Sequence, residues 1–215
     1  MSRPIRGPLA ILSLAFLVLN PLAVASAASG KVTVENLRGP LVNASFSSID
    51  PSGCIETDTF VTANRPTEQQ LPGRGTTTGI AAVNVFAFDA CTGATLLQAV
   101  GESDAVPAAD FQVSSQLLWA SLHTTIPVSN IDTGAVFDVV VDVDWTATSD
   151  ITRNHSNTND QYGGGCHVLN RWKGSGRVAD ASGLVSNGVT DFTPTATTSA
   201  EIGFVIDGFE VIDCP

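Results

Sequence analysis

The sequence predicts an all-β protein, folded as an antiparallel β-sandwich that is stapled by disulfides. Several short segments alternate apolar and polar residues, which is the period of half-buried strands. Turn-forming residues separate these segments, and after residue 27 the best helical candidate is a single turn at 107–111. Many short strands between turn signals are typical of a sandwich or a barrel, and we expect the sandwich.

The first 27 residues have the three-part layout of a secretory signal peptide. Arg3 and Arg6 precede an uncharged apolar run at 9–19, and small residues follow at 25–27. The run has 11 residues, whereas a membrane-spanning helix needs about 20. We therefore expect a signal peptide at 1–27, a single β-sandwich domain at 28–215, and a mature chain without a membrane anchor. The expected location is periplasmic or extracellular.

The expected strands follow one another along the whole mature chain. The clearest alternation is at 117–128, where Ala120, Leu122 and Ile126 share one parity and Ser121 and His123 share the other. The other expected strands are followed by polar turns or end in cysteines. The expected strands are 31–35, 42–48, 54–63, 80–88, 95–100, 117–128, 136–147, 176–185, 200–206 and 209–214.

The segment 136–147 bears on the choice between an enzyme and a binding protein. Its odd positions are all apolar, whereas its even positions include Asp138, Asp142 and Asp144. Asp142 and Asp144 would lie about 7 Å apart on one face, as in the carboxylate pairs of inverting glycosidases. A catalytic pair also needs a desolvated pocket that raises the pKa of one member. We therefore interpret the carboxylates as the solvent face of a strand.

The four cysteines predict two disulfides, because an even number in an exported chain is typical of a disulfide framework. Their wide spacing does not favour zinc. A weak internal repeat relates the stretches 42–48 and 141–147, each of which is followed by a Gly-Cys pair and later by an aromatic strand that ends in Cys. The repeat indicates two pseudo-repeated halves, each with its own disulfide, so the expected pairs are Cys54 with Cys91 and Cys166 with Cys214.

The stretch 150–165 is rich in Asp and Asn, and we expect it to be a polar connector. Its side-chain oxygens could bind calcium, although the ordered ligand positions of an EF-hand loop are missing. We expect no cofactor and no metal site, because the three histidines are scattered. Asn43 and Asn154 begin N-glycosylation sequons.

The charge of the chain limits the class of partner. Loss of residues 1–27 leaves eight Lys and Arg against 21 Asp and Glu, a formal charge of −13, so nucleic acid is not an expected partner. Arg171, Trp172 and Lys173 form a local basic cluster that could stack a sugar or bind a carboxylated ligand. Alternatively, the basic side chains pair with nearby Asp residues and the indole has a packing role in the fold. If the cluster binds a ligand, Trp172→Ala should weaken binding with little change in melting temperature.

These features predict an exported, non-catalytic protein that binds a glycan or a surface. The sequence has no G-x-S-x-G, H-E-x-x-H or P-loop pattern. The alternative is a secreted hydrolase, either a glycosidase or a metal-assisted enzyme. Such an enzyme would use Asp142 and Asp144 together with the stretch 150–165.

Overall fold

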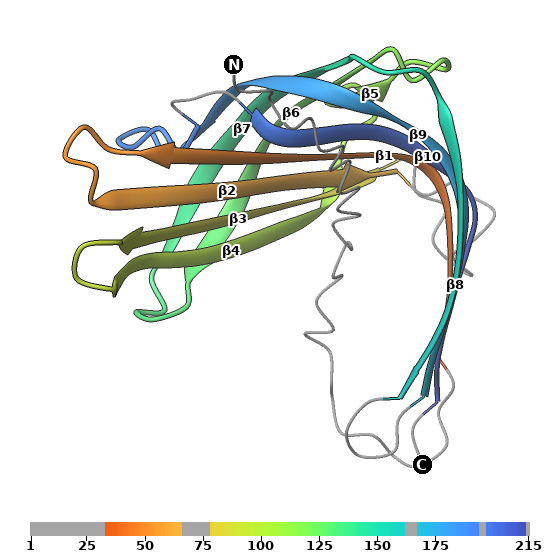
Figure 1. Cartoon of the computed structure of the whole chain (residues 1–215), viewed down its shortest axis with the longest axis horizontal. Coiled ribbons are helices and arrows are strands. Elements are labelled where there is room, and N and C mark those ends of the chain that lie inside the picture. The colour runs from red at the N-terminus through yellow and green to blue at the C-terminus, as the bar shows by residue number, and fades with distance from the viewer. Residues whose placement is uncertain (1–32, 66–77, 162–166, 194–196, 214–215) are drawn as a thin grey trace, which may run out of the picture.

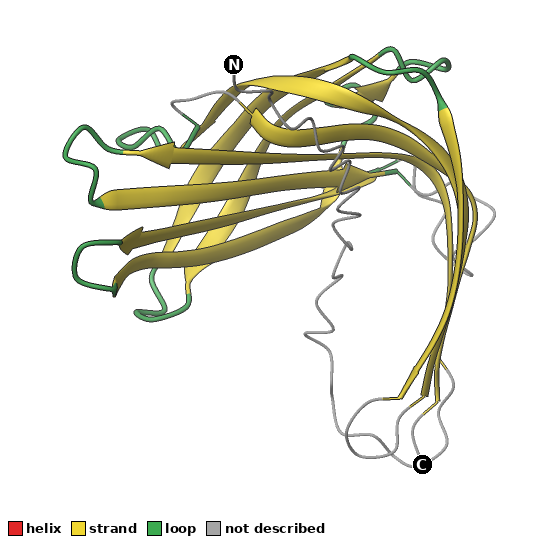
Figure 2. Ribbon diagram, in the orientation of Figure 1, coloured by secondary structure: helices red, strands yellow, loops and turns green. Residues whose placement is uncertain are grey.

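The protein is all-β and antiparallel, as the sequence predicts. A computed structural model describes residues 33–65, 78–161, 167–193 and 197–213, and in these ranges it contains strands and no helix (Figure 2). No helix in the described ranges is long and apolar enough to cross a membrane. The strands of the described part are β1 (Thr33–Ile49), β2 (Ile55–Asn64), β3 (Gly79–Asp89), β4 (Ala94–Val106), β5 (Phe111–Val113), β6 (Trp119–Asn130), β7 (Val136–Ala147), β8 (Thr152–Gln161), β9 (His167–Ser186) and β10 (Thr197–Asp213).

The strands form one sheet that curves back on itself (Figure 1). The pairs run in the order β10-β1-β2-β3-β4-β6-β7-β9-β8, β9 also pairs with β10, and β5 pairs with β6. Pairing therefore passes through eight of these strands and returns from β9 through β10 to β1. The arrangement as a two-sheet sandwich and the pseudo-repeat of two halves are not confirmed by this single sheet.

Four strands continue past this ring as an arm, which descends on the right of Figure 1. Residues 179–186 of β9 pair with β7, whereas residues 167–176 pair with β8 on one side and β10 on the other. The start of β1 pairs with the end of β10, so the arm has the order β8-β9-β10-β1. Irregular pairing between Leu37 and Gly39 on β1 lies opposite a bulge after Val205 on β10. Bulges bend strands and increase their twist, which is consistent with the change of direction here.

The core confirms the alternation predicted for β7. Val139, Val141, Val143 and Trp145 are buried, and the even positions from Asp138 to Thr146 are exposed. The other strands of the ring also point Val, Ala, Leu, Ile and Phe side chains inward to form one cluster. Across this interior, the indole Nε1 of Trp145 donates a hydrogen bond to the carbonyl oxygen of Asn43 on β1, at 2.7 Å.

The expectation of a polar connector at 150–165 is wrong for most of its length. Residues 152–161 form β8, which pairs along its length with the first half of β9. The stretch has no apolar alternation because it lies in the arm, outside the ring whose interior demands apolar side chains. As a strand, it directs successive Asn and Asp side chains to opposite faces, so it does not wrap them around one ion as a calcium loop would.

The predicted disulfide between Cys54 and Cys91 is present, with an S–S distance of 2.07 Å. It joins the β1–β2 turn to the β3–β4 turn, whose strands β2 and β3 are neighbours in the sheet. Cys166 and Cys214 lie outside the described residues, as does the expected signal peptide at 1–27. Their pairing and the cleavage therefore stay predictions.

Candidate functional site

The arm carries a surface of exposed basic side chains on β8 and β9. Lys173 is paired with His155, Arg171 with Asn157, and Ser175 with Arg153. Residues paired across two strands lie on the same face of a sheet, so these side chains share one face. Arg153, His155, Arg171 and Lys173 are all exposed, and we call these four residues the basic face.

Trp172 lies on the opposite face of the arm, because successive side chains of a strand alternate. Its indole is half-buried and covers Gly174 on the same strand. A Cβ atom at Gly174 would lie 2.9 Å from ring atom Cζ2 and 2.8 Å from the carbonyl oxygen of Phe204. The structure thus brings Arg171 and Lys173 together and separates them from Trp172. Sequence reasoning placed these three residues in one site because it treated neighbours in the chain as neighbours on a surface.

The bases of the arm contrast with the charge of the remaining sheet. Residues 39–64 and 78–152 contain twelve Asp and Glu and neither Lys nor Arg. The register pairs Lys173 with Asp207 of β10, so this base has an acidic residue as its cross-strand neighbour. For Lys173, this register is compatible with the alternative in which an Asp residue pairs with the base.

Arg177 continues the same side of β9 toward the ring but has a structural role. Its Nε donates to the carbonyl of Gln116 at 3.1 Å, and its Nη1 donates to the carbonyl of Ser149 at 2.8 Å. These bonds tie β9 to the turns before β6 and after β7. Arg177 is therefore not counted in the basic face.

The acidic side of β7 contains a histidine–carboxylate pair that sequence reasoning missed. Nδ1 of His123 on β6 lies 2.6 Å from Oδ1 of Asp142, and the two side chains are 50% and 57% exposed. The signal that could have found the pair is the register of β6 and β7, which places these two residues opposite each other. A histidine held by a carboxylate occurs in hydrolytic triads, but here both members are on an open strand face with Asp138 and Asp144 exposed beside them. This exposure fits a solvent face better than a desolvated acid–base pair.

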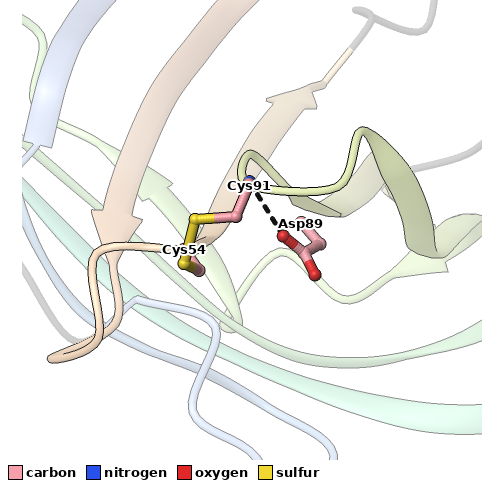
Figure 3. Close-up of side chains that lie close together, drawn as sticks. All are labelled: Cys54, Asp89 and Cys91. Carbon is pink, nitrogen blue, oxygen red and sulfur yellow. Dashed lines mark hydrogen bonds between the residues drawn. A yellow bond between two sulfur atoms is a disulfide. The ribbon is translucent and has the colours of Figure 1, made fainter.

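Cys54, Asp89 and Cys91 lie close together and have the residue types of a metal site (Figure 3). The two cysteines are joined as a disulfide, so neither offers the thiolate that binds a metal. Asp89 accepts hydrogen bonds from the backbone N–H groups of Cys91 and Thr92, at 2.8 and 3.0 Å. Its hydrogen bonds with Thr92 and Cys91 lower the pKa of its carboxyl. Cys54, Asp89 and Cys91 therefore lie at turns that are held by a disulfide and by hydrogen bonds.

Glu201 is the carboxylate with the clearest burial among the described residues. It lies on β10, opposite Asn43 of β1, and its side chain covers Gly176 of β9. Burial raises the pKa of the Glu201 carboxyl, although a hydrogen bond with the Asn43 side chain partly opposes the rise. The bare backbone at Gly176 provides the space in which this carboxyl is held.

Glu201→Gln is expected to stabilise the protein at neutral pH. Because its pKa is raised in the folded state, the folded chain binds this proton more tightly than the unfolded chain does. Wild-type stability should therefore decrease as pH rises from the ordinary pKa of glutamate through the raised value, and stay lower above it. Urea unfolding between about pH 4 and pH 7 should show the advantage of the variant growing with pH. The control is Glu102→Gln at an exposed position of β4, and an advantage that is independent of pH would contradict the assignment.

Comparison with known proteins adds little. No family model matches the chain, and no curated protein matches its sequence. Among solved structures, a crystallised protein of Nitrosomonas europaea, provisionally described as AttH, aligns with 12% identity and a TM-score of 0.31. The alignment covers 82% of this chain and 51% of that one, so the chain spans about half the length of that protein. A similarity at this level carries no argument about function.

Proposed function

We propose that the chain is an exported, non-catalytic binding protein whose basic face binds a carboxylated glycan. The observation that carries the proposal is the basic face, which presents exposed Arg and Lys side chains on two adjacent strands of an otherwise acidic chain. Export is supported by the layout of residues 1–27 and by the Cys54–Cys91 disulfide.

The geometry of the basic face suits a repeated anion better than a single small one. Arg171 and Lys173 are two positions apart on β9, about 7 Å along the strand, and Arg153 and His155 lie on the adjacent strand. Guanidinium groups bind carboxylates through two parallel hydrogen bonds, and a polymer of uronic acids offers carboxylates at regular intervals.

The test is binding of polygalacturonate to the mature chain by calorimetry, with neutral dextran as the control polymer. Arg171→Ala combined with Lys173→Ala should weaken binding by about tenfold, because each exposed charged contact contributes up to about 1 kcal/mol. Binding should also weaken as salt increases. Melting temperature should change little, because both side chains are exposed.

Trp172→Ala is the matched control on the other face of β9. We now expect this variant to lower the melting temperature, since the indole packs on Gly174, and to leave polymer affinity nearly unchanged. Weaker binding in Trp172→Ala but not in the double variant would contradict the proposal. The second candidate is a hydrolase, which the His123–Asp142 pair favours. Such an enzyme would release reducing ends from the polymer, and Asp142→Asn would abolish this release.

A further inference from the structure

Three phenylalanines lie on the outer face of the sheet, where β2 and β3 approach the disulfide-linked turns. Phe60 is 45% exposed, and Phe86 and Phe88 are half-buried, with ring centroids 5.6 Å apart. The same stretch of β3 turns only small side chains inward, from Ala81 through Val83 and Val85 to Ala87. Large aromatic side chains outside and small ones inside reverse the ordinary arrangement, and such exposed apolar groups mark interaction sites.

Carboxylates alternate with these rings. The register pairs Asp58 of β2 with Phe86 and Glu56 with Phe88, so each carboxylate has a ring beside it on the same face. We call Phe60, Phe86, Phe88, Glu56 and Asp58 the aromatic face. Residues 39–64 and 78–152, which include the whole of β2, β3 and β4, contain neither Lys nor Arg. The aromatic face therefore has rings and negative charge and no basic side chain from these strands.

This combination selects a positively charged partner. A guanidinium or ammonium group is attracted to the face of an aromatic ring and to a neighbouring carboxylate at the same time. From Glu56 to Phe60 the face extends about 14 Å along β2, which is the length of about four extended residues. Strands and a nearby disulfide hold the rings in place, so little conformational entropy is lost on binding.

We propose that the aromatic face docks a basic segment of another polypeptide, in which arginines stack on Phe60, Phe86 and Phe88 and pair with Glu56 and Asp58. A second copy of the chain is disfavoured as the partner, because each mature copy has a formal net charge of −13 and like-charged copies repel. The proposal uses different strands from the basic face and does not depend on the proposed function.

The test measures binding of three synthetic twelve-residue peptides, in which Ser alternates with Arg, Lys or Glu. The Arg peptide should bind more tightly than the Lys peptide by about threefold or more, because arginine stacks better on rings, and the Glu peptide should not bind. Phe60→Ser combined with Phe86→Ser should weaken binding of the Arg peptide by about tenfold. Glu56→Gln combined with Asp58→Asn should have a similar effect. If the double variant does not fold, Phe60→Ser alone, at the most exposed of the three rings, provides the test of the aromatic contribution.

Matched controls lie on the outer face of β7, away from the aromatic face. Val140→Ser removes an equally exposed apolar side chain, and Asp144→Asn removes an exposed carboxylate; both should bind the Arg peptide within twofold of wild type. Equal loss in Asp144→Asn and in the Glu56 and Asp58 variant would assign binding to net charge and overturn the proposal. So would unchanged binding in the phenylalanine variants. A dimer in sedimentation that is lost both in Phe60→Ser and in Arg171→Ala would identify a second copy as the occupant instead.

Discussion

Trp145→Ala is expected to lower the free energy of unfolding by about 4 kcal/mol, within the range for deletion of a buried aromatic side chain. Trp145 is 1% exposed and is the largest of the fully buried side chains. It points from β7 into a core composed mostly of Val and Ala, which cannot move enough to fill the volume of an indole. The variant also deprives the Asn43 carbonyl oxygen of the indole N–H that lies 2.7 Å away. Urea unfolding followed by circular dichroism measures the loss.

Two further variants separate packing from hydrogen bonding at this position. Trp145→Phe keeps a ring but no N–H donor, so it should recover part of the loss and still cost about 1–3 kcal/mol. Trp119→Ala is the matched control, because Trp119 lies on neighbouring β6 and is 47% exposed; its effect should stay near 0.5 kcal/mol, as is usual at the surface. If Trp119→Ala and Trp145→Ala had equal effects, the inward direction of the odd positions of β7 would be wrong.

The alternation on β7 could be predicted because the core demands it. Each inward position from Val139 to Trp145 is apolar, and each intervening position is free to be acidic. The requirement for apolar side chains in the core therefore appears in the sequence as an alternation of apolar and acidic residues. The same reasoning identifies Asp142 as solvent-facing, and its exposure confirms this.

What could not be predicted depends on pairing between distant strands. The sequence of β8 has no periodic pattern. Among the described strands β8 pairs with β9 alone, and its described side chains do not pack into the core of the ring. The His123–Asp142 contact and the alignment of Arg153 and His155 with Arg171 and Lys173 follow from cross-strand register. Register is set by turns, bulges and the burial of whole faces, so it cannot be read from one segment at a time.

The faces of β3 show a different limit of sequence reasoning. Phe86 and Phe88 alternate with Val85 and Ala87, so either set could line the core. Hydrophobicity favours the phenylalanines, yet the smaller side chains are the buried ones. The ring is closed by eight strands, which leaves an interior that side chains from every strand must share. Space in this interior, and not hydrophobicity alone, therefore decides which set points inward.

Removing the Cys54–Cys91 disulfide should destabilise the protein by about 4 kcal/mol in the chain-entropy model. The bond closes a loop of 37 residues, so in the unfolded chain it removes conformations that the reduced chain would recover. Cys54→Ser combined with Cys91→Ser should lower the melting temperature by about 10 °C for a domain of this size. Thermal unfolding followed by circular dichroism at neutral pH measures the change.

Neutral pH matters because hydrogen bonds also hold both linked turns. Asp50 accepts from the N–H groups of Ile55 and Cys54 at 2.8 and 3.0 Å, and these donors together with Ser52 lower the pKa of its carboxyl. A lowered pKa contributes stability above the ordinary value of aspartate that is lost as pH falls through the folded value. Both turns should therefore remain held at neutral pH, so that the variant reports the disulfide alone. Wild type treated with a reductant should match the double variant, and peptide mapping that linked Cys54 to any cysteine other than Cys91 would refute the pairing.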